Sequence, residues 1–293
     1  MEPSDVRHVG VVGAGLMGSG IVEVCARAGL RVTFVEANDG LIAAGRGRVE
    51  RSVGKAVERG KLDAAAAEDA LGRIDASYRL ESLADVDLVI EAATEDRDAK
   101  RAIFGRLGEL TRPEVILASN TSSIPIHELG AASGRADRVI GMHFFNPPPV
   151  MALLELTPSA ATSEETFGFV RAFGTEVLGK TCVRSGDEAG FIVNRLLIPY
   201  LFDAIRLYAS GFATREDIDT AMRLGLAHPM GPLELSDLIG LDTLVAIGEV
   251  METAFAGDQR YEVPSLLREL VSQGKLGKKS GGGFYEARPA TDR

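Results

Sequence analysis

Residues 9–36 read VGVVGAGLMGSGIVEVCARAGLRVTFVE and contain the pattern that decides the fold of this chain. The β-branched run at 9–12 is typical of a short strand buried inside a parallel sheet. After a glycine-rich turn, apolar side chains recur at the spacing of one helix face: Ile21, Val24, Cys25 and Ala28. Gly29 is placed to end that helix, and residues 32–35 predict a second strand. The stretch therefore predicts one strand–helix–strand unit, the building block of a parallel α/β sheet.

The turn between the first strand and the helix has the spacing of a dinucleotide-binding loop, GAGLMG at residues 13–18. In such a loop Gly13 permits the tight turn, Gly15 lets a pyrophosphate approach the backbone, and Gly18 lets the helix pack closely on the sheet. The first N–H groups of the helix then face the phosphates. The cofactor-binding residues predicted in this turn are Gly13, Gly15, Leu16, Met17 and Gly18.

Glu36 closes the second predicted strand, 18 positions after Gly18. A carboxylate at this place accepts hydrogen bonds from the ribose hydroxyls and repels a 2′-phosphate, so the sequence predicts NAD rather than NADP as the cofactor. Residues 36–39 contain no arginine, which agrees with that prediction. The alternative is a purely structural glycine turn followed by a surface glutamate.

The alternation of strands and helices continues to about residue 185 and then stops. Short apolar runs at 88–90, 115–117 and 139–142 predict further strands, and residues 41–70 and 97–110 predict helices. From residue 186 onward only helices are predicted, over 191–209, 215–223, 232–247 and 264–273. We therefore expect an α/β protein with a Rossmann-like parallel-sheet domain at residues 1–185, followed by an all-helical domain at residues 186–293.

The composition excludes several classes of partner. The chain carries 32 lysines and arginines against 42 aspartates and glutamates, a formal net charge of −10, so no attraction to nucleic acid is expected. No apolar run is long enough for a membrane span, and residues 1–7 do not resemble a secretion signal. Cys25 and Cys182 have no further ligand at metal-binding spacing, so neither a metal site nor a disulfide framework is predicted. These features predict a soluble, cytoplasmic protein.

Polar residues that the fold itself does not require follow two of the predicted strands. The cluster SNTSS at 119–123 stands at the edge where open α/β sheets bind ligands. Its alternative role is to cap a helix that begins near Pro125. His143 ends another strand, and imidazole is the natural base for oxidising a hydroxyl to a carbonyl. A structural histidine is equally compatible with this position.

Two more polar side chains stand inside apolar segments. Glu155 interrupts the predicted strand LLEL at 153–156, and a buried carboxylate is costly unless it is paired. A histidine partner would explain it, because the carboxylate fixes the imidazole tautomer and stabilises the imidazolium. The alternative is a glutamate facing solvent from an edge strand. Asn194, in the first turn of the long helix at 191–209, faces either a ligand or the helical core.

Six segments, in order along the chain, resemble the L-3-hydroxyacyl-CoA dehydrogenase family, which includes the bacterial 3-hydroxybutyryl-CoA dehydrogenases. They are GAGLMGSGI at 13–21, SNTSS at 119–123, HFFNPPPVMALLE at 143–155, GFIVNRLL at 190–197, HPMGPLELSDLIGLD at 228–242 and GKKSGGGFY at 277–285. The match covers nearly the whole chain. It implies an NAD-binding domain and a helical domain that forms a homodimer. The segment TPSAATS at 157–163 departs from the family in length, and we expect a loop change there without effect on the chemistry.

The resemblance also implies roles for individual residues. His143 matches the catalytic base, Glu155 the residue that orients it, Ser122 the serine that binds the substrate oxygen, and Asn194 the asparagine that holds the reacting acyl group. The positions that match the lining of the NAD site are Glu95, Lys100, Asn120 and Lys279. Those that match the contact with the CoA nucleotide are Ser52 and Arg59.

A basic run in an otherwise acidic chain supports the CoA assignment: Arg46, Arg48, Arg51, Lys55, Arg59 and Lys61. Such a run suits phosphate groups, although a solvated helix face would carry the same charges. The predicted function is NAD-dependent oxidation of the 3-hydroxyl of a short 3-hydroxyacyl-CoA thioester, or its reverse. One alternative is a dehydrogenase of a free hydroxy acid such as a sugar acid or carnitine. Another is an NAD-binding protein without catalytic activity.

Overall fold

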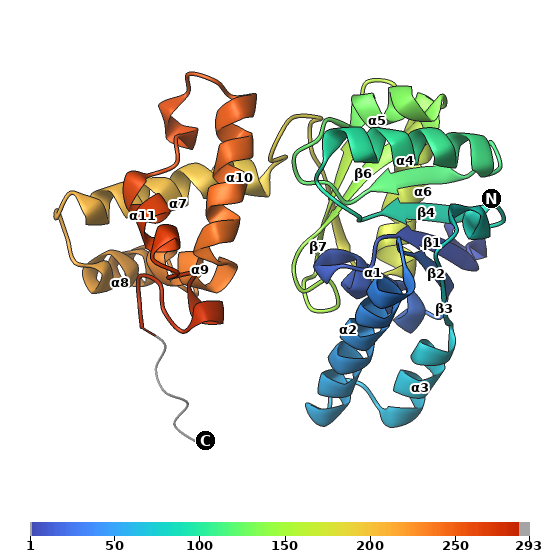
Figure 1. The fold of residues 1–293 in the computed structure, drawn as a ribbon, viewed down its shortest axis with the longest axis horizontal. Coiled ribbons are helices and arrows are strands. Elements are labelled where there is room, and N and C mark those ends of the chain that lie inside the picture. Colours follow the sequence, from blue (N-terminus) through green and yellow to red (C-terminus); the bar gives the residue numbers. More distant parts are fainter. Residues whose placement is uncertain (1, 287–293) are drawn as a thin grey trace. The chain divides into compact units, whose positions relative to one another are not determined.

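A computed structural model describes residues 2–286 of the chain. These residues form two compact units, and the boundary between the units falls between Phe191 and Ile192. The first unit is a sheet covered by helices on both faces, and the second consists of helices joined by turns (Figure 1). The α/β architecture with a helical C-terminal part, which the sequence predicts, is confirmed.

The sheet of the first unit contains eight strands in the order β3-β2-β1-β4-β5-β6-β7-β8. All neighbouring pairs are parallel except β6 and β7, which run antiparallel. The order β3-β2-β1-β4-β5-β6 is that of a Rossmann sheet. The strands are β1 (His8–Val12), β2 (Arg31–Val35), β3 (Ile74–Ser77), β4 (Leu88–Glu91), β5 (Ile116–Ser119), β6 (Val139–Phe144), β7 (Leu153–Pro158) and β8 (Thr181–Arg184).

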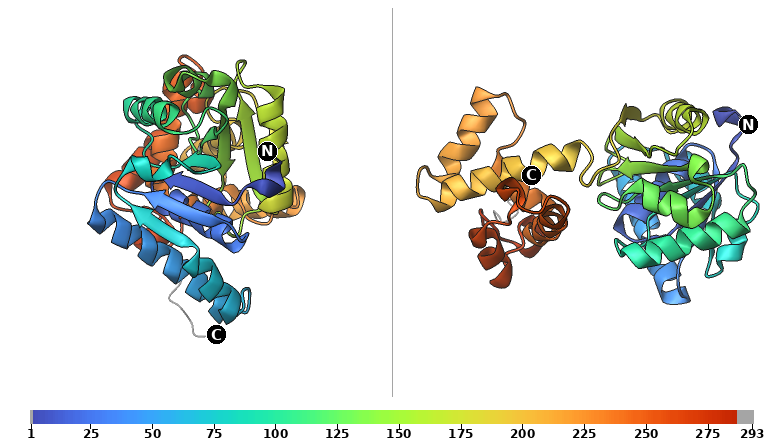
Figure 2. Two further views of the ribbon diagram at one scale, coloured as in Figure 1. Left: turned by 90° about the vertical axis from the view of Figure 1, so that its right-hand side faces the viewer. Right: turned by 90° about the horizontal axis from the view of Figure 1, so that it is seen from above.

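Each face of this sheet has its own hydrophobic core. On one face β1 and β4 pack against α1 (Leu16–Arg27), α2 (Asp39–Glu58), α3 (Ala64–Gly72) and α6 (Glu164–Ala172). On the other face α4 (Arg97–Leu110) and α5 (Ile126–Ser133) bury residues such as Phe104 and Leu129 (Figures 1 and 2). The carboxyl ends of the parallel strands therefore meet at one edge, where open α/β sheets bind ligands.

Two predictions for this unit need correction. The single helix expected at 41–70 is two helices, because the chain turns after Glu58 and Asp63 caps α3 by accepting a hydrogen bond from the Ala66 N–H at 2.8 Å. The strands β3 and β8 were not predicted. Both are short and carry polar side chains, as expected for strands at the two edges of a sheet.

The second unit contains α7 (Val193–Ala209), α8 (Arg215–Gly225), α9 (Pro232–Ile239), α10 (Leu241–Ala254) and α11 (Ser265–Ser272). The single helix predicted at 232–247 is wrong, because Gly240 adopts a φ of 104° and ends α9 before α10 begins. None of the helices within residues 2–286 is both long enough and apolar enough to cross a bilayer.

Two buried carboxylates tie the end of the described chain to this unit. Asp237, on α9, accepts hydrogen bonds from the backbone N–H groups of Phe284 and Tyr285, both at 2.8 Å. Asp219, on α8, caps α9 by accepting from the N–H of Leu233 at 2.8 Å, and it also accepts from the Tyr285 hydroxyl at 2.9 Å. The segment HPMGPLELSD at 228–237 therefore holds the segment GKKSGGGFY at 277–285 in place through these hydrogen bonds.

Candidate functional site

The glycine-rich turn after β1 is built as the sequence predicts. Gly13 has a φ of 90°, and a Cβ there would lie 2.5 Å from the Cα of Ala93 at the end of the neighbouring strand. A Cβ on Gly18 would collide with the carbonyl oxygen of Gly13. These two glycines are therefore required by the protein itself, before any ligand is considered.

Gly15 differs from the other two glycines in this turn. A Cβ built on it would meet no atom within 4 Å, so the protein alone does not demand glycine there. Gly15 is also the N-cap of α1, and no side chain caps that helix. The free space and the uncapped N–H groups fit a phosphate-bearing ligand, which would approach the backbone most closely at Gly15. Leu16, in the first turn of α1, is largely exposed beside it.

Glu36 lies against the same turn. Its Oε1 accepts a hydrogen bond from the N–H of Ala14 at 2.7 Å, which holds the carboxylate beside the glycines. From the other side, the Arg48 guanidinium donates to the carbonyl oxygen of Ala14 at 3.3 Å. The carboxylate thus stands where a ribose would bind, and its hydrogen bond to a dinucleotide stays a prediction.

His143 and Glu155 form a buried pair. They are directly opposite one another in the antiparallel ladder of β6 and β7, and His143 Nδ1 lies 2.8 Å from Glu155 Oε2. Glu155 is fully buried and His143 is 7% exposed. The alternative of a solvent-facing Glu155 is wrong, because β8 pairs with β7 and removes it from the edge of the sheet.

The tautomer of His143 follows from this geometry. A carboxylate can only accept, so Nδ1 carries the proton and Nε2 is the basic nitrogen. Within the described chain Nε2 has no hydrogen-bond partner. The rings of Phe145 and Phe191 flank the imidazole, with centroids 4.7 and 5.5 Å away. The arrangement presents one basic nitrogen from an otherwise apolar wall.

The loop after β5 is anchored beside this pair. Asn120 Oδ1 accepts a hydrogen bond from the N–H of Phe144 at 2.9 Å, which joins the ends of β5 and β6. Glu95 accepts from the Thr121 hydroxyl at 2.8 Å and from the N–H of Ser122 at 3.0 Å. Glu95 and Asn120 therefore position the loop that carries Ser122, and their contact with a cofactor stays a prediction.

The alternative role of this loop as a helix cap is wrong. The N-cap of α5 is Pro125, which has no side-chain cap. Asp187 serves this helix instead, by accepting from the N–H of His127 at 3.0 Å. The Thr121 hydroxyl accepts from the N–H of Ile124 at 3.0 Å, inside the loop itself. The cluster is therefore not explained by the helix that follows it.

A second buried pair, which the sequence analysis missed, lies at the end of β4. Glu91 is fully buried, and its two oxygens lie 2.7 and 2.6 Å from Nζ of Lys100, which is 2% exposed. Glu91 also accepts from the Ser119 hydroxyl and the N–H of Ala93, both at 2.8 Å. Lys100 is thus bound to Glu91 inside the unit, and its place in the lining of the NAD site stays a prediction.

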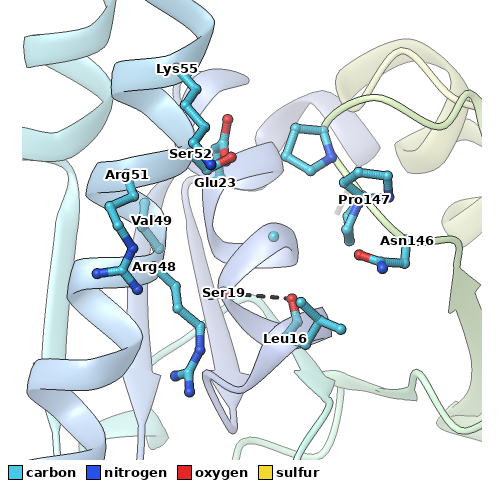
Figure 3. Close-up of a pocket in the computed structure, with 13 residues that line it drawn as sticks. Leu16, Ser19, Glu23, Arg48, Val49, Arg51, Ser52, Lys55, Asn146 and Pro147 are labelled. Carbon is cyan, nitrogen blue, oxygen red and sulfur yellow. Dashed lines mark hydrogen bonds between the residues drawn. The ribbon is translucent and has the colours of Figure 1, made fainter. Parts of the chain in front are cut away.

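A pocket of about 240 Å³ opens between α1, α2 and the segment that follows β6 (Figure 3). Ser52 lines it, together with three of the six residues of the basic run at 46–61, Arg48, Arg51 and Lys55. The remaining basic residues, Arg46, Arg59 and Lys61, lie outside this lining. The opposite wall is made by residues 146–149, three positions beyond His143. The pocket can receive an elongated ligand that carries phosphate.

Two predicted site residues belong to the second unit. Asn194 is buried in the first turn of α7. Nζ of Lys279 lies 2.7 Å from Oδ2 of Asp242, at the start of α10. Among residues 2–286, no group of three histidine, cysteine or acidic side chains is arranged to hold a metal ion.

Known proteins resemble this chain over nearly its full length. The family model for the NAD-binding domain of 3-hydroxyacyl-CoA dehydrogenase matches residues 8–188, and the model for the C-terminal domain of that family matches residues 190–287. A 3-hydroxybutyryl-CoA dehydrogenase of Mycobacterium tuberculosis is 50% identical over 281 residues, which cover 96% of this chain and 98% of the relative.

Two further relatives agree. A probable 3-hydroxybutyryl-CoA dehydrogenase of Bacillus subtilis is 45% identical over 96% of this chain and 98% of its own length. The solved structure of (S)-3-hydroxybutyryl-CoA dehydrogenase from Ralstonia eutropha is 44% identical and superposes with a TM-score of 0.89 over 97% of this chain and all of that one. The chain belongs to the 3-hydroxyacyl-CoA dehydrogenase family and is an NAD-dependent enzyme of that family.

Proposed function

We propose that this enzyme oxidises the 3-hydroxyl of a short (3S)-3-hydroxyacyl-CoA to the 3-oxoacyl-CoA, or catalyses the reverse reduction. The observation that carries the proposal is the pairing of His143 with the buried Glu155 at the ligand-binding edge of the sheet. The 3-hydroxybutyryl-CoA dehydrogenases among its relatives support a short acyl group.

In the proposed mechanism, Nε2 of His143 removes the proton from the C3 hydroxyl. Glu155 accepts from the opposite ring nitrogen and stabilises the imidazolium that forms. The Ser122 hydroxyl is proposed to hold the same substrate oxygen, and Asn194 the acyl carbonyl. When bound, NAD supplies the acceptor for the hydride that leaves C3. In the reverse direction His143 returns the proton to the alkoxide oxygen.

The binding of CoA is proposed for the pocket beside α2. Arg48, Arg51 and Lys55 give that pocket the positive charge that a nucleotide phosphate needs, and Ser52 adds a hydroxyl. A free hydroxy acid would make no use of these side chains, so they favour the thioester over the sugar acid or carnitine alternative. Intact His143, Glu155 and Ser122 argue against an NAD-binding protein without activity.

Loss of NADH absorbance with acetoacetyl-CoA tests the proposal, with NADPH and free acetoacetate as controls. We expect rapid turnover only with NADH and the thioester together. Turnover of free acetoacetate at a similar rate would favour a hydroxy-acid dehydrogenase. Binding of NADH without turnover of any of these substrates would overturn the proposed reaction.

A homodimer formed by the helical unit is part of the proposal. Large apolar side chains lie exposed on this unit, among them Phe212 at 78%, Leu224 at 80% and Leu226 at 60%. Exposed apolar groups of this size suit a protein interface. Light scattering coupled to size-exclusion chromatography should give twice the chain mass, and the monomer mass would contradict the dimer. The cytoplasmic location stays a prediction.

A further inference from the structure

The pocket beside α2 contains one acidic side chain among its basic ones. Glu23, on α1, lines the pocket and is only 1% exposed. Its Oε1 lies 3.1 Å from the guanidinium of Arg27, one helical turn further along α1. Its Oε2 is buried and has no hydrogen-bond partner within residues 2–286. A buried carboxylate oxygen without a donor is costly and unusual, and Oε2 keeps its capacity to accept a hydrogen bond.

The basic side chains of the pocket do not donate a hydrogen bond to Oε2 of Glu23. Arg48, Arg51 and Lys55 line the same pocket from α2, yet none of them is paired with Glu23. In Figure 3 the two arginines and the lysine extend from α2, whereas Asn146 and Pro147 lie on the opposite side. The pocket thus offers donors for phosphate along one helix and a separate acceptor on the other.

The position of Glu23 suits the middle of an elongated ligand. Asn146 lies three positions after His143 and lines the pocket, so one end of the pocket adjoins the segment that carries the base. The pocket is narrow where α1 approaches residues 147–149, because a Cβ on Gly20 would lie 2.6 Å from Cδ of Pro148. A molecule with its reacting carbon at His143 and its phosphates at α2 would therefore run through the pocket that Glu23 lines.

We propose that Glu23 accepts a hydrogen bond from an amide N–H of the pantetheine arm of the substrate, and so determines specificity for that arm. The inference rests on the proposed function, because it takes the substrate to be a CoA thioester. A carboxylate accepts readily from an uncharged N–H and repels phosphate, so Glu23 and the cations of α2 recognise different parts of CoA.

The test compares three substrates: acetoacetyl-CoA, acetoacetyl-pantetheine and an S-ethyl acetoacetyl thioester that has no amide. Glu23→Met keeps the side-chain volume and removes the acceptor, whereas Glu23→Gln keeps an acceptor oxygen. For Glu23→Met we expect KM to rise roughly tenfold or more for the first two substrates, as for a lost hydrogen bond to a charged group, with kcat nearly unchanged. The S-ethyl thioester should show no change, and Glu23→Gln should retain most of the affinity.

Two control variants separate this effect from charge. Lys55→Met should raise KM for acetoacetyl-CoA and not for acetoacetyl-pantetheine, which lacks the nucleotide phosphates. Glu50→Met removes one negative charge from the exposed side of α2, outside the pocket, and should leave all three substrates unaffected. Fluorescence titration with NADH should give the same Kd for Glu23→Met as for the unaltered protein.

A measurement on the unaltered protein makes the test independent of any variant's folding. Replacing each amide N–H of acetoacetyl-pantetheine in turn by an ester oxygen should raise KM for one analogue and not for the other. Unchanged KM for both analogues, or an equal effect of Glu23→Met on the S-ethyl thioester, would overturn the inference and leave the proposed function intact. Absence of turnover with acetoacetyl-CoA by the unaltered protein would overturn both.

Discussion

Two buried glutamates, each bonded to a basic side chain, lie at the same edge of the sheet, and the two pairs have different roles. In each pair a fully buried glutamate stands at or near the end of an apolar strand, Glu155 in β7 and Glu91 in β4. Lys100 places its ammonium against both oxygens of Glu91 and is 2% exposed. His143 meets Glu155 through one ring nitrogen and keeps the other without a partner in the described chain.

The difference shows how the role of a buried carboxylate can be inferred from its bonding partners. A carboxylate that is closed off by a cation, a hydroxyl and a backbone N–H fixes the positions of the segments around it. A carboxylate whose partner retains an unused basic atom supports proton transfer at that atom. Burial of a carboxylate alone therefore does not distinguish a structural group from a catalytic one. The distinction lies in whether the side chain bonded to that carboxylate keeps a basic atom without a hydrogen-bond partner.

Replacing the base should give the largest effect. For His143→Gln we expect kcat to fall about 10²- to 10⁴-fold, the usual contribution of a general acid–base group. The Kd for NADH and the melting temperature should stay close to those of the unaltered protein. His8→Gln is the matched control, because His8 begins β1, whereas His143 lies near the carboxyl end of β6. The His8 ring is hydrogen-bonded to Thr33. The kcat of this variant should equal that of the unaltered protein. Retained activity in His143→Gln would contradict the assignment.

Breaking the other pair should act on stability. Lys100→Met leaves Glu91 as an uncompensated buried charge, which should cost about 3–5 kcal/mol in the free energy of unfolding measured with urea. The double variant Glu91→Gln with Lys100→Met removes both charges and should recover most of that loss. If Lys100→Met instead kept its stability and lost NADH binding, Lys100 would face the cofactor, as the family resemblance implies.

Weakening the catalytic pair without removing the base should give an intermediate effect. Glu155→Gln keeps the shape of the side chain and replaces a charged acceptor by a neutral one. The lost stabilisation of the imidazolium should lower kcat roughly 10- to 100-fold, the equivalent of one hydrogen bond to a charged group. KM for NADH should change little. A kcat equal to that of the unaltered protein would show that Glu155 only fills space.

The buried thiol of Cys25 is neutral, so it can be compared with the two buried glutamates. Burial raises the pKa of the Cys25 thiol to about 12, so almost no thiolate exists at pH 8. Iodoacetamide at that pH should leave Cys25 unmodified in the folded protein and modify it after unfolding in urea. Mass spectrometry of the alkylated peptides measures this directly. Alkylation of Cys25 in the folded protein would show that its surroundings open more readily than its burial indicates.

Much of the fold was predictable because its signals are local. The strand–helix–strand unit at 9–36 combines β-branched runs, a glycine turn and a helical apolar spacing within one short stretch. The edge strands β3 and β8 carry weaker signals, because their residues are mixed in polarity and only partly buried. The break between α9 and α10 was missed because Gly240 stands inside a continuous apolar pattern.

The site was predictable where a residue type carries its own chemistry, as for His143 and Glu155. Glu91 was missed although it gives nearly the same signal as Glu155, a single carboxylate in a short apolar run. Its partner Lys100 lies nine positions away on a helix, and only the packing of α4 against the sheet brings the two together. Glu23 gave no signal, because an acidic residue on a helix is ordinary until its burial is known.

The closure of the helical unit by Asp219 and Asp237 has a consequence for synthesis on the ribosome. The eighth strand of the sheet ends at Arg184, so every strand of the first unit has been translated before α7 begins. The donors that Asp237 requires, the N–H groups of Phe284 and Tyr285, are made only after all the helices from α7 to α11. The first unit can therefore fold while translation continues, whereas the helical unit completes its bonding only after Phe284 and Tyr285 have left the exit tunnel.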